Sequence, residues 1–323
     1  QTLKGLPLIM FDQLLPTMRV VALPTKTNFR GVTKREVALF QGEHGWGEFS
    51  PFLEYDDRES AQWLASAIEA ATSARPEKFR SVISVNATIP AITDGQRLKT
   101  IIDSYPGCKT FKVKVGDNAS DDLLRLQLLR TIRPEAAIRL DVNGLWSVDE
   151  ALTQLEKIYS EIGNIEYVEQ PVATVDEMRE LKSRADFELR IAADEVIRKA
   201  ADPFAIDLSG AADVVMLKVQ PLGGITRALA IADHHKLPVV VSSALESAVG
   251  IHYGLELAAT VKDLSFDCGL ATGSLMATDV AHLPIVEGAI GLGDLDIKLD
   301  GLDVASDRYE WWKNRVMRCA ENL

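Results

Sequence analysis

The chain has 323 residues, 47% of them hydrophobic and 25% charged, which is typical of a globular protein with one large core and a smaller second unit. The formal net charge of -12 argues against a nucleic-acid partner, because such binding needs Lys and Arg that neutralise phosphates. Three scattered cysteines without a CxxC pair, and no apolar run of the ~18 residues that span a membrane, favour a cytoplasmic protein with no membrane partner.

The first part of the chain predicts a small α+β unit. Segments 17–23, 35–42 and 45–51 read as strands of an antiparallel sheet, and segment 58–72 reads as a helix. We expect a capping domain over residues 1–80, completed by the C-terminal segment 295–323, whose two adjacent tryptophans could equally serve an oligomer contact. The start of the chain lacks the pattern of a secretory signal peptide.

From about residue 82 the sequence alternates between strands and helices. Apolar runs of strand length lie at 81–88, 110–116, 138–144, 165–171, 189–195, 213–219, 237–243 and 264–270. The capping-box pairs Ser147/Glu150 and Thr174/Glu177 predict the starts of two helices, and Ser120, Asp121 and Asp122 predict the start of a third. Such alternation predicts a β/α barrel over residues 81–294. A doubly wound open sheet is the alternative, but no GxGxxG motif follows any strand.

The segment FKVKVG, residues 111–116, places Val113 and Val115 on one face of a strand and Lys112 and Lys114 on the other. Taken alone, this pattern is typical of a half-exposed strand with its lysines in water. Further polar residues end the following strands: Asp141, Glu169, Asp194 with Glu195, and Lys218. From Lys114 onward the steps are 27, 28, 25 and 24 residues, about one βα unit each. In a barrel, these strand ends would meet at one mouth, where the active sites of such folds lie.

Three carboxylates at one mouth would repel one another unless a cation neutralises them. Asp141, Glu169 and Asp194 are therefore candidate ligands of Mg²⁺, with Mn²⁺ as a possible substitute, and no His or Cys stands near them to favour zinc. A lysine near a cation and other lysines has a lowered pKa, so it can act as a general base. Lys114 and Lys218 would face a substrate from opposite sides and remove a proton beside its carboxylate.

These residues resemble the enolase superfamily, and within it the o-succinylbenzoate synthases of the actinobacterial type. The matching segments are FKVKVG, LDVNGLWS, EYVEQPVAT, IAADEVIRKAADP, VVMLKVQPLGGI, VVVSSALESAVGI and GWGEFSPFLEY. The resemblance implies a modified (β/α)7β barrel with a small α+β capping domain. It also implies a Mg²⁺-dependent lyase that dehydrates 2-succinyl-6-hydroxy-2,4-cyclohexadiene-1-carboxylate to o-succinylbenzoate in menaquinone biosynthesis, by syn elimination through a metal-stabilised enediolate.

The resemblance also implies roles for the residues at the mouth. Lys114 would abstract the proton, Lys218 would stabilise the delocalised anion from the other face of the ring, and Lys112 would stay charged and hold the substrate carboxylate. Asp141, Glu169 and Asp194 would hold the metal.

Weaker candidates for substrate contact follow from position. Ser242 and Ser243 end a strand and would bind the succinyl carboxylate, or alternatively cap the next helix. Gly269 and Leu270 end the last strand, where small size leaves room for the ligand. Arg30 is a candidate lid residue, with a solvated arginine as the alternative. Asn143, on the same face as Asp141, and Asn86, at the end of the first strand, would position the ligand or a metal-bound water.

Several functions stay open. A racemase of N-acylamino acids or an epimerase of dipeptides would use the same metal and lysines, and a muconate-type cycloisomerase is a more distant variant. A metal-free aldolase with a Schiff-base lysine would leave the three acids without a role. A catalytically silent binding barrel would leave both lysines and acids unexplained. The expected partner is a small anionic carboxylate, and the sequence is compatible with a monomer without fixing the oligomeric state.

Overall fold

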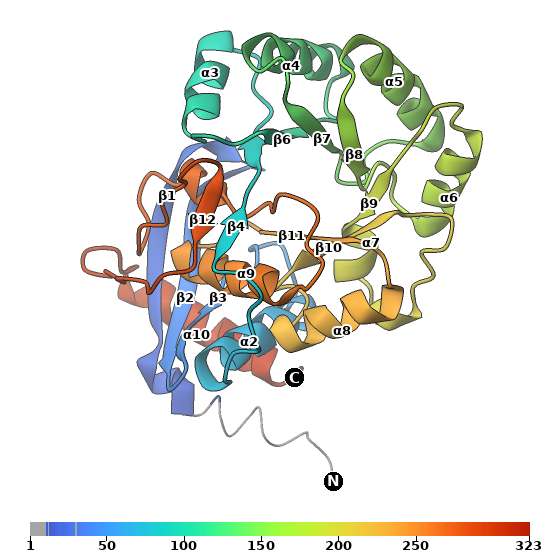
Figure 1. Cartoon of the computed structure of the whole chain (residues 1–323). Helices are drawn as coiled ribbons and strands as arrows, with labels where there is room; N and C mark the ends of the chain where they lie inside the picture. Colours follow the sequence, from blue (N-terminus) through green and yellow to red (C-terminus); the bar gives the residue numbers. More distant parts are fainter. Residues whose placement is uncertain (1–10, 12, 30) are drawn as a thin grey trace.

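The computed structural model describes residues 11, 13–29 and 31–323. Figure 1 shows a ring of strands surrounded by helices, with an antiparallel sheet standing at its side. The mixed α/β architecture, a barrel with a separate antiparallel cap, confirms the predicted fold class. None of the helices in the described ranges is both long enough and apolar enough to cross a membrane.

The cap sheet contains three antiparallel strands in the order β1-β2-β3. Its elements are the 3-10 turn η2 (Leu15–Thr17), β1 (Arg19–Phe29), β2 (Val32–Gly42), β3 (Gly45–Phe49) and helix α2 (Asp57–Thr72). Helix α2 begins where the side chain of Asp56 accepts a hydrogen bond from the backbone N–H of Glu59. Its buried face, which includes Trp63 and Leu64, packs on the sheet.

The C-terminal helix α10 (Ser306–Ala320) belongs to the same core as the cap. Trp312 is fully buried, and its ring meets that of Phe49 edge-on with centroids 5.9 Å apart. Trp312 also donates a hydrogen bond to Glu36 in β2 over 2.8 Å. The tail therefore packs back on the first unit, as expected, while the domain boundaries at residues 80 and 295 stay predictions.

Seven parallel strands form most of the barrel, in chain order around the ring. They are β5 (Ala87–Ile89), β6 (Thr110–Lys114), β7 (Ala137–Asp141), β8 (Ile165–Glu169), β9 (Ile191–Ala193), β10 (Val214–Lys218) and β11 (Val239–Ser242). The segment around Cys268 closes the ring, because parallel bridges join Cys268 to Val85 and Gly269 to Ser242. This segment acts as an eighth strand, so β6 and β10 lie on opposite sides of the barrel.

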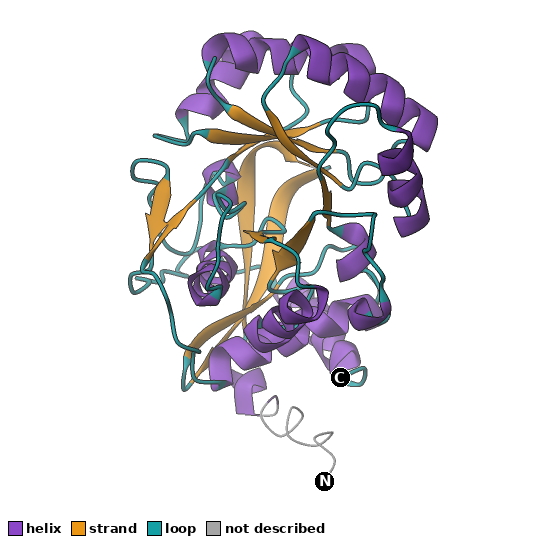
Figure 2. Cartoon of the chain, turned by 45° about the vertical axis from the view of Figure 1, so that its right-hand side comes forward, coloured by secondary structure: helices purple, strands orange, loops and turns teal. Residues whose placement is uncertain are grey.

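Helices cover the outside of the barrel (Figure 2). They are α3 (Gly95–Asp103), α4 (Ala119–Ile132), α5 (Val148–Glu161), α6 (Val175–Arg184), α7 (Glu195–Arg198), α8 (Ile225–His235) and α9 (Ala248–Thr260), with short 3-10 turns η3 (Pro203–Ala205) and η4 (Thr272–Leu275). Both predicted capping boxes are confirmed at the starts of α5 and α6. The start expected at Ser120 is wrong by one residue, because Asn118 caps α4 and accepts from two backbone N–H groups.

The prediction of one strand over 81–88 is wrong. Strand β4 (Val82–Ser84) pairs antiparallel with β12 (Ala289–Gly291) in a separate two-stranded sheet, and the chain joins the barrel only from Val85. Both pieces are short and have similar composition, so the local sequence does not mark the point where one sheet ends and the other begins.

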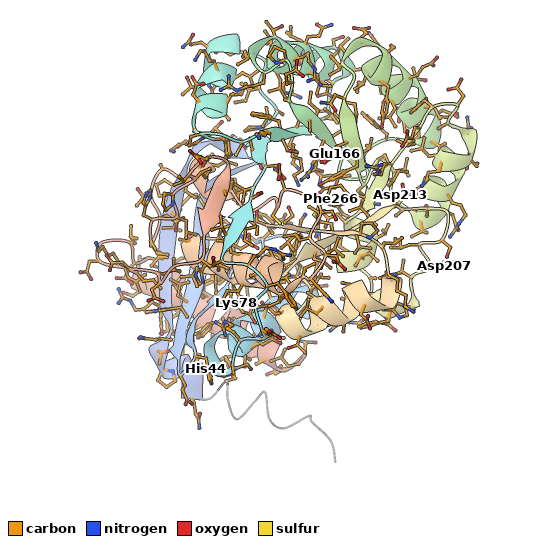
Figure 3. All side chains as sticks on the ribbon, viewed as in Figure 1. His44, Lys78, Glu166, Asp207, Asp213 and Phe266 are labelled. Atoms are coloured by element: carbon orange, nitrogen blue, oxygen red, sulfur yellow. The ribbon has the colours of Figure 1, made fainter. Side chains whose placement is uncertain are left out.

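The inside of the barrel is filled below its mouth. Tyr167, Met216 and Val240 point inward and pack with Phe266. The fully buried Arg139 lies among them, with its guanidinium 4.8 Å from the centroid of the Tyr167 ring. Figure 3 places Glu166, which accepts a hydrogen bond from Arg139 over 2.5 Å, near Phe266 within the ring. We call Arg139, Glu166, Tyr167 and Phe266 the barrel plug.

Candidate active site

Six charged side chains gather at the carboxyl end of the barrel strands. They are Lys112 and Lys114 on β6, Asp141 on β7, Glu169 on β8, Asp194 just after β9 and Lys218 on β10. All are buried except Lys114, which is partly buried. Val113 and Val115 point the other way and belong to the core between barrel and helices. The lysines of FKVKVG thus point into the barrel rather than into water.

Each lysine is paired with a carboxylate. The Nζ of Lys114 lies 2.5 Å from Oδ2 of Asp141, and the Nζ of Lys218 lies 2.6 Å from Oδ2 of Asp194. The Nζ of Lys112 lies 3.0 Å from Oε2 of Glu169 and 3.3 Å from Oδ2 of Asp141. Three positive and three negative groups therefore share a small buried volume, so each group strongly influences the ionisation of its neighbours.

The pKa shifts report this crowding. Burial and the nearby Asp141 raise the pKa of Glu169 above its ordinary value, and the lysines offset this only in part. Burial would also raise the pKa of Asp141, but Lys114 and Lys112 outweigh burial and hold it far below its usual range. Burial would lower the pKa of Lys112, yet Glu169 and Asp141 raise it well above the ordinary value, so Lys112 keeps its positive charge.

The carboxylates fit a hard divalent cation. Among the described residues, Oδ1 of Asp141 and Oε2 of the neighbouring Glu195 are buried without a hydrogen-bond partner, and Oδ1 of Asp194 lies 3.2 Å from Nε of Arg198 as an ion pair. Carboxylate oxygens are the ligands that Mg²⁺ prefers, and leaving them unsatisfied in the interior is costly. Within the described ranges, no three acidic, His or Cys side chains lie close enough together to hold a metal ion. Lys114 and Lys218 contact the Oδ2 atoms of Asp141 and Asp194.

A cavity of about 20 Å³ lies among these residues. Its lining includes Lys112, Lys114, Asp141, Asn143, Lys218, Ser242, Ser243 and Gly269 from the predicted set, and Phe52, Thr88, Ala244, Leu245 and Thr272 besides. The structure therefore brings together the predicted lysines, Asp141 and most of the predicted substrate contacts. The cavity holds about one water molecule, so the substrate must displace side chains as it enters.

The serine pair does not cap the following helix. Helix α9 begins at Ala248, and Ser247 is its N-cap. Ser243 instead donates to the backbone oxygen of Gly269 over 2.7 Å and lies 2.9 Å from the hydroxyl of Thr272. Gly269 makes room for Ser242, because a Cβ atom at this position would collide with the Ser242 hydroxyl.

Two other sequence-based expectations change, and a third is not tested. Leu270 points away from the mouth and packs near Gly254 of α9, because successive residues of a strand alternate between faces. Asn86 accepts a hydrogen bond from Arg139 of the barrel plug over 2.8 Å, so it lies below the mouth. Arg30 lies outside the described residues.

Asn143 lies beside the candidate base rather than free in the mouth. Its Oδ1 accepts from Lys114 over 2.6 Å, and its Nδ2 donates to Glu195 over 3.1 Å. Glu195 in turn accepts from Arg198 over 2.8 Å, and Arg198 reaches the hydroxyl of Tyr55 in the cap over 3.2 Å. A continuous chain of polar contacts thus connects Lys114 to the cap.

Sequence reasoning missed five residues of the lining, among them Phe52 and Thr88. Phe52 comes from the cap, just after β3, and the guanidinium of Arg35 lies 4.3 Å from its ring centroid. Thr88 lies on β5 and has a buried hydroxyl without a hydrogen-bond partner. The segment GWGEFSPF contains Phe52, but only the packing of the cap on the barrel shows that this ring covers the mouth.

A second buried acidic cluster lies where the cap meets the barrel. Glu48 of β3 accepts hydrogen bonds from Ser247 and Gly250 at the start of α9, and Glu246 accepts from the backbone N–H of Ala244 over 2.6 Å. Burial, with the nearby Glu48, raises the pKa of Glu246 to about 7. This cap–barrel acid pair is close to the mouth, since Ala244 and Leu245 line the cavity.

Family models match both parts of the chain. Residues 20–71 match the enolase N-terminal domain-like family, and residues 99–300 match the enolase C-terminal domain-like family. Among solved structures, an N-succinyl Arg/Lys racemase from Bacillus cereus is 20% identical with a TM-score of 0.73, covering 89% of this chain and 97% of its own. The L-Ala-D/L-Glu epimerase from Bacillus subtilis is 21% identical with a TM-score of 0.72, covering 87% and 96%. At this identity the likeness shows the fold.

Sequence relatives are closer. An o-succinylbenzoate synthase of Mycobacterium ulcerans is 47% identical over 313 residues, which cover 95% of this chain and 94% of the relative. That of Mycolicibacterium smegmatis is 43% identical over 322 residues and covers 98% of both chains. Both matches extend over the cap as well as the barrel.

Proposed function

The chain belongs to the o-succinylbenzoate synthase family of the enolase superfamily and is an enzyme of the hydro-lyase class. From this premise we propose that it converts 2-succinyl-6-hydroxy-2,4-cyclohexadiene-1-carboxylate to o-succinylbenzoate, a step of menaquinone biosynthesis. The observation that supports this activity is the meeting of Lys114 and Lys218 from opposite sides of the barrel, above a set of buried carboxylates.

Lys114 is the proposed base. Its Nζ is held by Asp141 and by the Oδ1 of Asn143, so its position is fixed before the substrate arrives. In its neutral form it takes the proton beside the substrate carboxylate. The resulting ammonium remains on the same face of the ring, where it can return a proton to the departing hydroxyl group. Water then leaves, and the ring becomes aromatic.

The other two lysines stay cationic in this proposal. Lys218 stabilises the delocalised anion from the opposite face of the ring. Lys112 holds the substrate carboxylate, in keeping with its raised pKa. Both functions need ammonium groups in a water-poor mouth, where electrostatic interactions are strong.

Asp141, Glu169 and Asp194 are the proposed holders of Mg²⁺, or of Mn²⁺ in its place. When bound, the cation supplies positive charge that stabilises the enediolate. Oδ1 of Asp141, which is buried without a hydrogen-bond partner among the described residues, supports this assignment. Ser242, Ser243 and Asn143 line the same cavity and are the proposed contacts of the succinyl carboxylate and its surroundings.

Location and assembly are also part of the proposal. The three cysteines are buried and unpaired, as expected in a reducing compartment, which supports a cytoplasmic location. A monomer is compatible with the site, whose acids and lysines all lie on one chain.

The test is an assay of the purified protein with the cyclohexadiene substrate, following the loss of its absorbance. We expect turnover with Mg²⁺, loss of turnover after treatment with EDTA, and recovery when Mg²⁺ or Mn²⁺ is added back. Turnover that survives complete removal of metal would contradict the metal assignment. Absence of turnover with metal and substrate both present would contradict the proposed reaction.

Racemisation of N-acylamino acids is the second candidate. The placement of Lys114 and Lys218 on opposite sides of the ring suits two-base chemistry, and the B. cereus neighbour is a racemase. Incubation with N-succinylated amino acids in deuterium oxide separates the two activities. Deuterium at the α-carbon would support racemisation, and its absence would leave dehydration as the activity.

A further inference from the structure

Gln170, which directly follows Glu169, lies at the centre of the backbone contacts at the mouth. It is fully buried and has a φ of 41°, in the left-handed region that a glutamine rarely adopts. Asn143 and Leu245, which line the cavity, are also left-handed, with φ of 55° and 63°. Strained residues of this kind persist where surrounding contacts hold them, and they concentrate at functional sites.

The hydrogen bonds of Gln170 connect the ends of three neighbouring strands. Its backbone oxygen accepts from Gly144, in the turn after β7, over 2.7 Å, and its backbone N–H donates to Ala192 of β9 over 2.9 Å. Its side-chain Oε1 accepts from the backbone N–H groups of Asp194 and Val196 over 3.2 Å and 3.3 Å. These strands carry Asp141, Glu169 and Asp194.

The side chain of Gln170 is itself held in place. Its Nε2 donates to the backbone oxygen of Val172 over 2.8 Å, which decides which end of the amide faces Asp194. With the amide fixed in this orientation, Oε1 is available only to the N–H groups at the start of α7. A side chain without an acceptor at this position would leave the buried N–H of Asp194 and the partly buried N–H of Val196 without that partner.

We infer that Gln170 is a positioning residue that sets the relative placement of the three carboxylates before a metal ion binds. The inference rests on the proposed metal site. Residues that orient metal ligands without touching the metal typically change metal affinity about 10- to 100-fold when they are replaced. Gln170 would act in this way through the backbone of Asp194 and the turn after Asp141.

The chain offers a matched control at the other end of the same strand. Asn164, just before β8, also has a left-handed φ, of 49°, and its Nδ2 donates to the backbone oxygen of Ala136 over 3.0 Å. It therefore ties β8 to its surroundings in a similar manner but lies away from the carboxylates. Its replacement perturbs the strand without touching the mouth.

The experiment measures the affinity of the metal-free protein for Mn²⁺ by titration calorimetry, together with the melting temperature of each variant. Q170M keeps the volume but loses the acceptor, and Q170N keeps an amide suited to a left-handed backbone but is too short to reach Asp194. We expect both to weaken Mn²⁺ binding at least about tenfold, and N164A to change it less than about twofold while lowering the melting temperature.

Folded Q170M or Q170N that binds Mn²⁺ as tightly as the unmodified protein would overturn the inference. Equal losses in N164A and Q170N would also overturn it, because they would point to general loosening of the strand. If the unmodified protein itself fails to bind Mn²⁺, the proposed metal site is wrong, and this inference falls with it. Q170N covers the case in which Q170M does not fold.

Discussion

Two ends of the same barrel bury charge in different ways. In the barrel plug, the cation Arg139 is paired with Glu166, held by Asn86 and packed against the ring of Tyr167. At the mouth, three lysines and three acids crowd together. Among the described residues, each end includes a buried polar atom without a hydrogen-bond partner, Oδ1 of Asp141 at the mouth and Nη2 of Arg139 in the plug. In the plug, one positive and one negative charge neutralise each other within a packed core. At the mouth, the positive and negative charges balance only when all the lysines and acids are counted together. We therefore expect the crowded charges of the mouth, and not the matched pair of the plug, to take part in catalysis.

The largest effect should come from Lys114→Ala at the mouth. Loss of a general base typically costs 10²–10⁴-fold in rate, and we expect the rate of dehydration to fall at least about 10³-fold. Mn²⁺ affinity, measured by calorimetry, should remain, because the three acids are intact. Lys157→Ala, on the exposed face of α5, is the control and should keep full activity. Near-native turnover in Lys114→Ala would show that another group is the base.

The converse change is Arg139→Met in the plug. It leaves Asn86 and the backbone oxygen of Asp267 without their donor and Glu166 without its cation. We expect the free energy of unfolding, from urea titration, to fall by about 2–3 kcal/mol. The kcat value, measured at an assay temperature about 20 degrees under the melting temperature of the variant, should change less than about threefold. A loss of activity as large as that of Lys114→Ala would remove the distinction between the two ends.

A smaller effect should come from the cap–barrel acid pair, whose neighbouring cation is the buried Arg35. The folded pKa of Glu246, about 7, exceeds its ordinary value of 4.5. The native state therefore binds the proton of Glu246 more tightly than the unfolded chain does. The contribution of this group to stability is complete below about pH 4.5 and is lost as the pH rises toward 7. Glu246→Gln removes this loss and should raise the free energy of unfolding at pH 8, relative to pH 5, by about 1–2 kcal/mol.

Urea titrations at both pH values measure this change, with Glu43→Gln in an exposed turn as the control. If the variant keeps the same difference in stability between pH 5 and pH 8 as the unmodified protein, Glu246 does not titrate in this range. The effect of crowding on the pKa of an acid would then be specific to the mouth.

Local and periodic features were predictable from the sequence. The capping boxes of α5 and α6 depend on side chains three residues apart, and the lysines and acids follow the spacing of the βα units. Non-local features were not. Nothing near Val82 tells that β4 pairs with β12, more than 200 residues later. The contacts of Gln170 depend on where three separate strands end, so composition and spacing gave it no role.

The sharing of one core by the two ends of the chain has a consequence for biosynthesis. Trp312 and Val316 of α10 pack in the same cluster as Phe49 and Trp63, which are translated first. The early segment cannot complete its interior until α10 has left the ribosome. The cap is therefore completed only after the barrel has been translated, and a nascent chain that stalls before α10 would expose the apolar side chains of the cap.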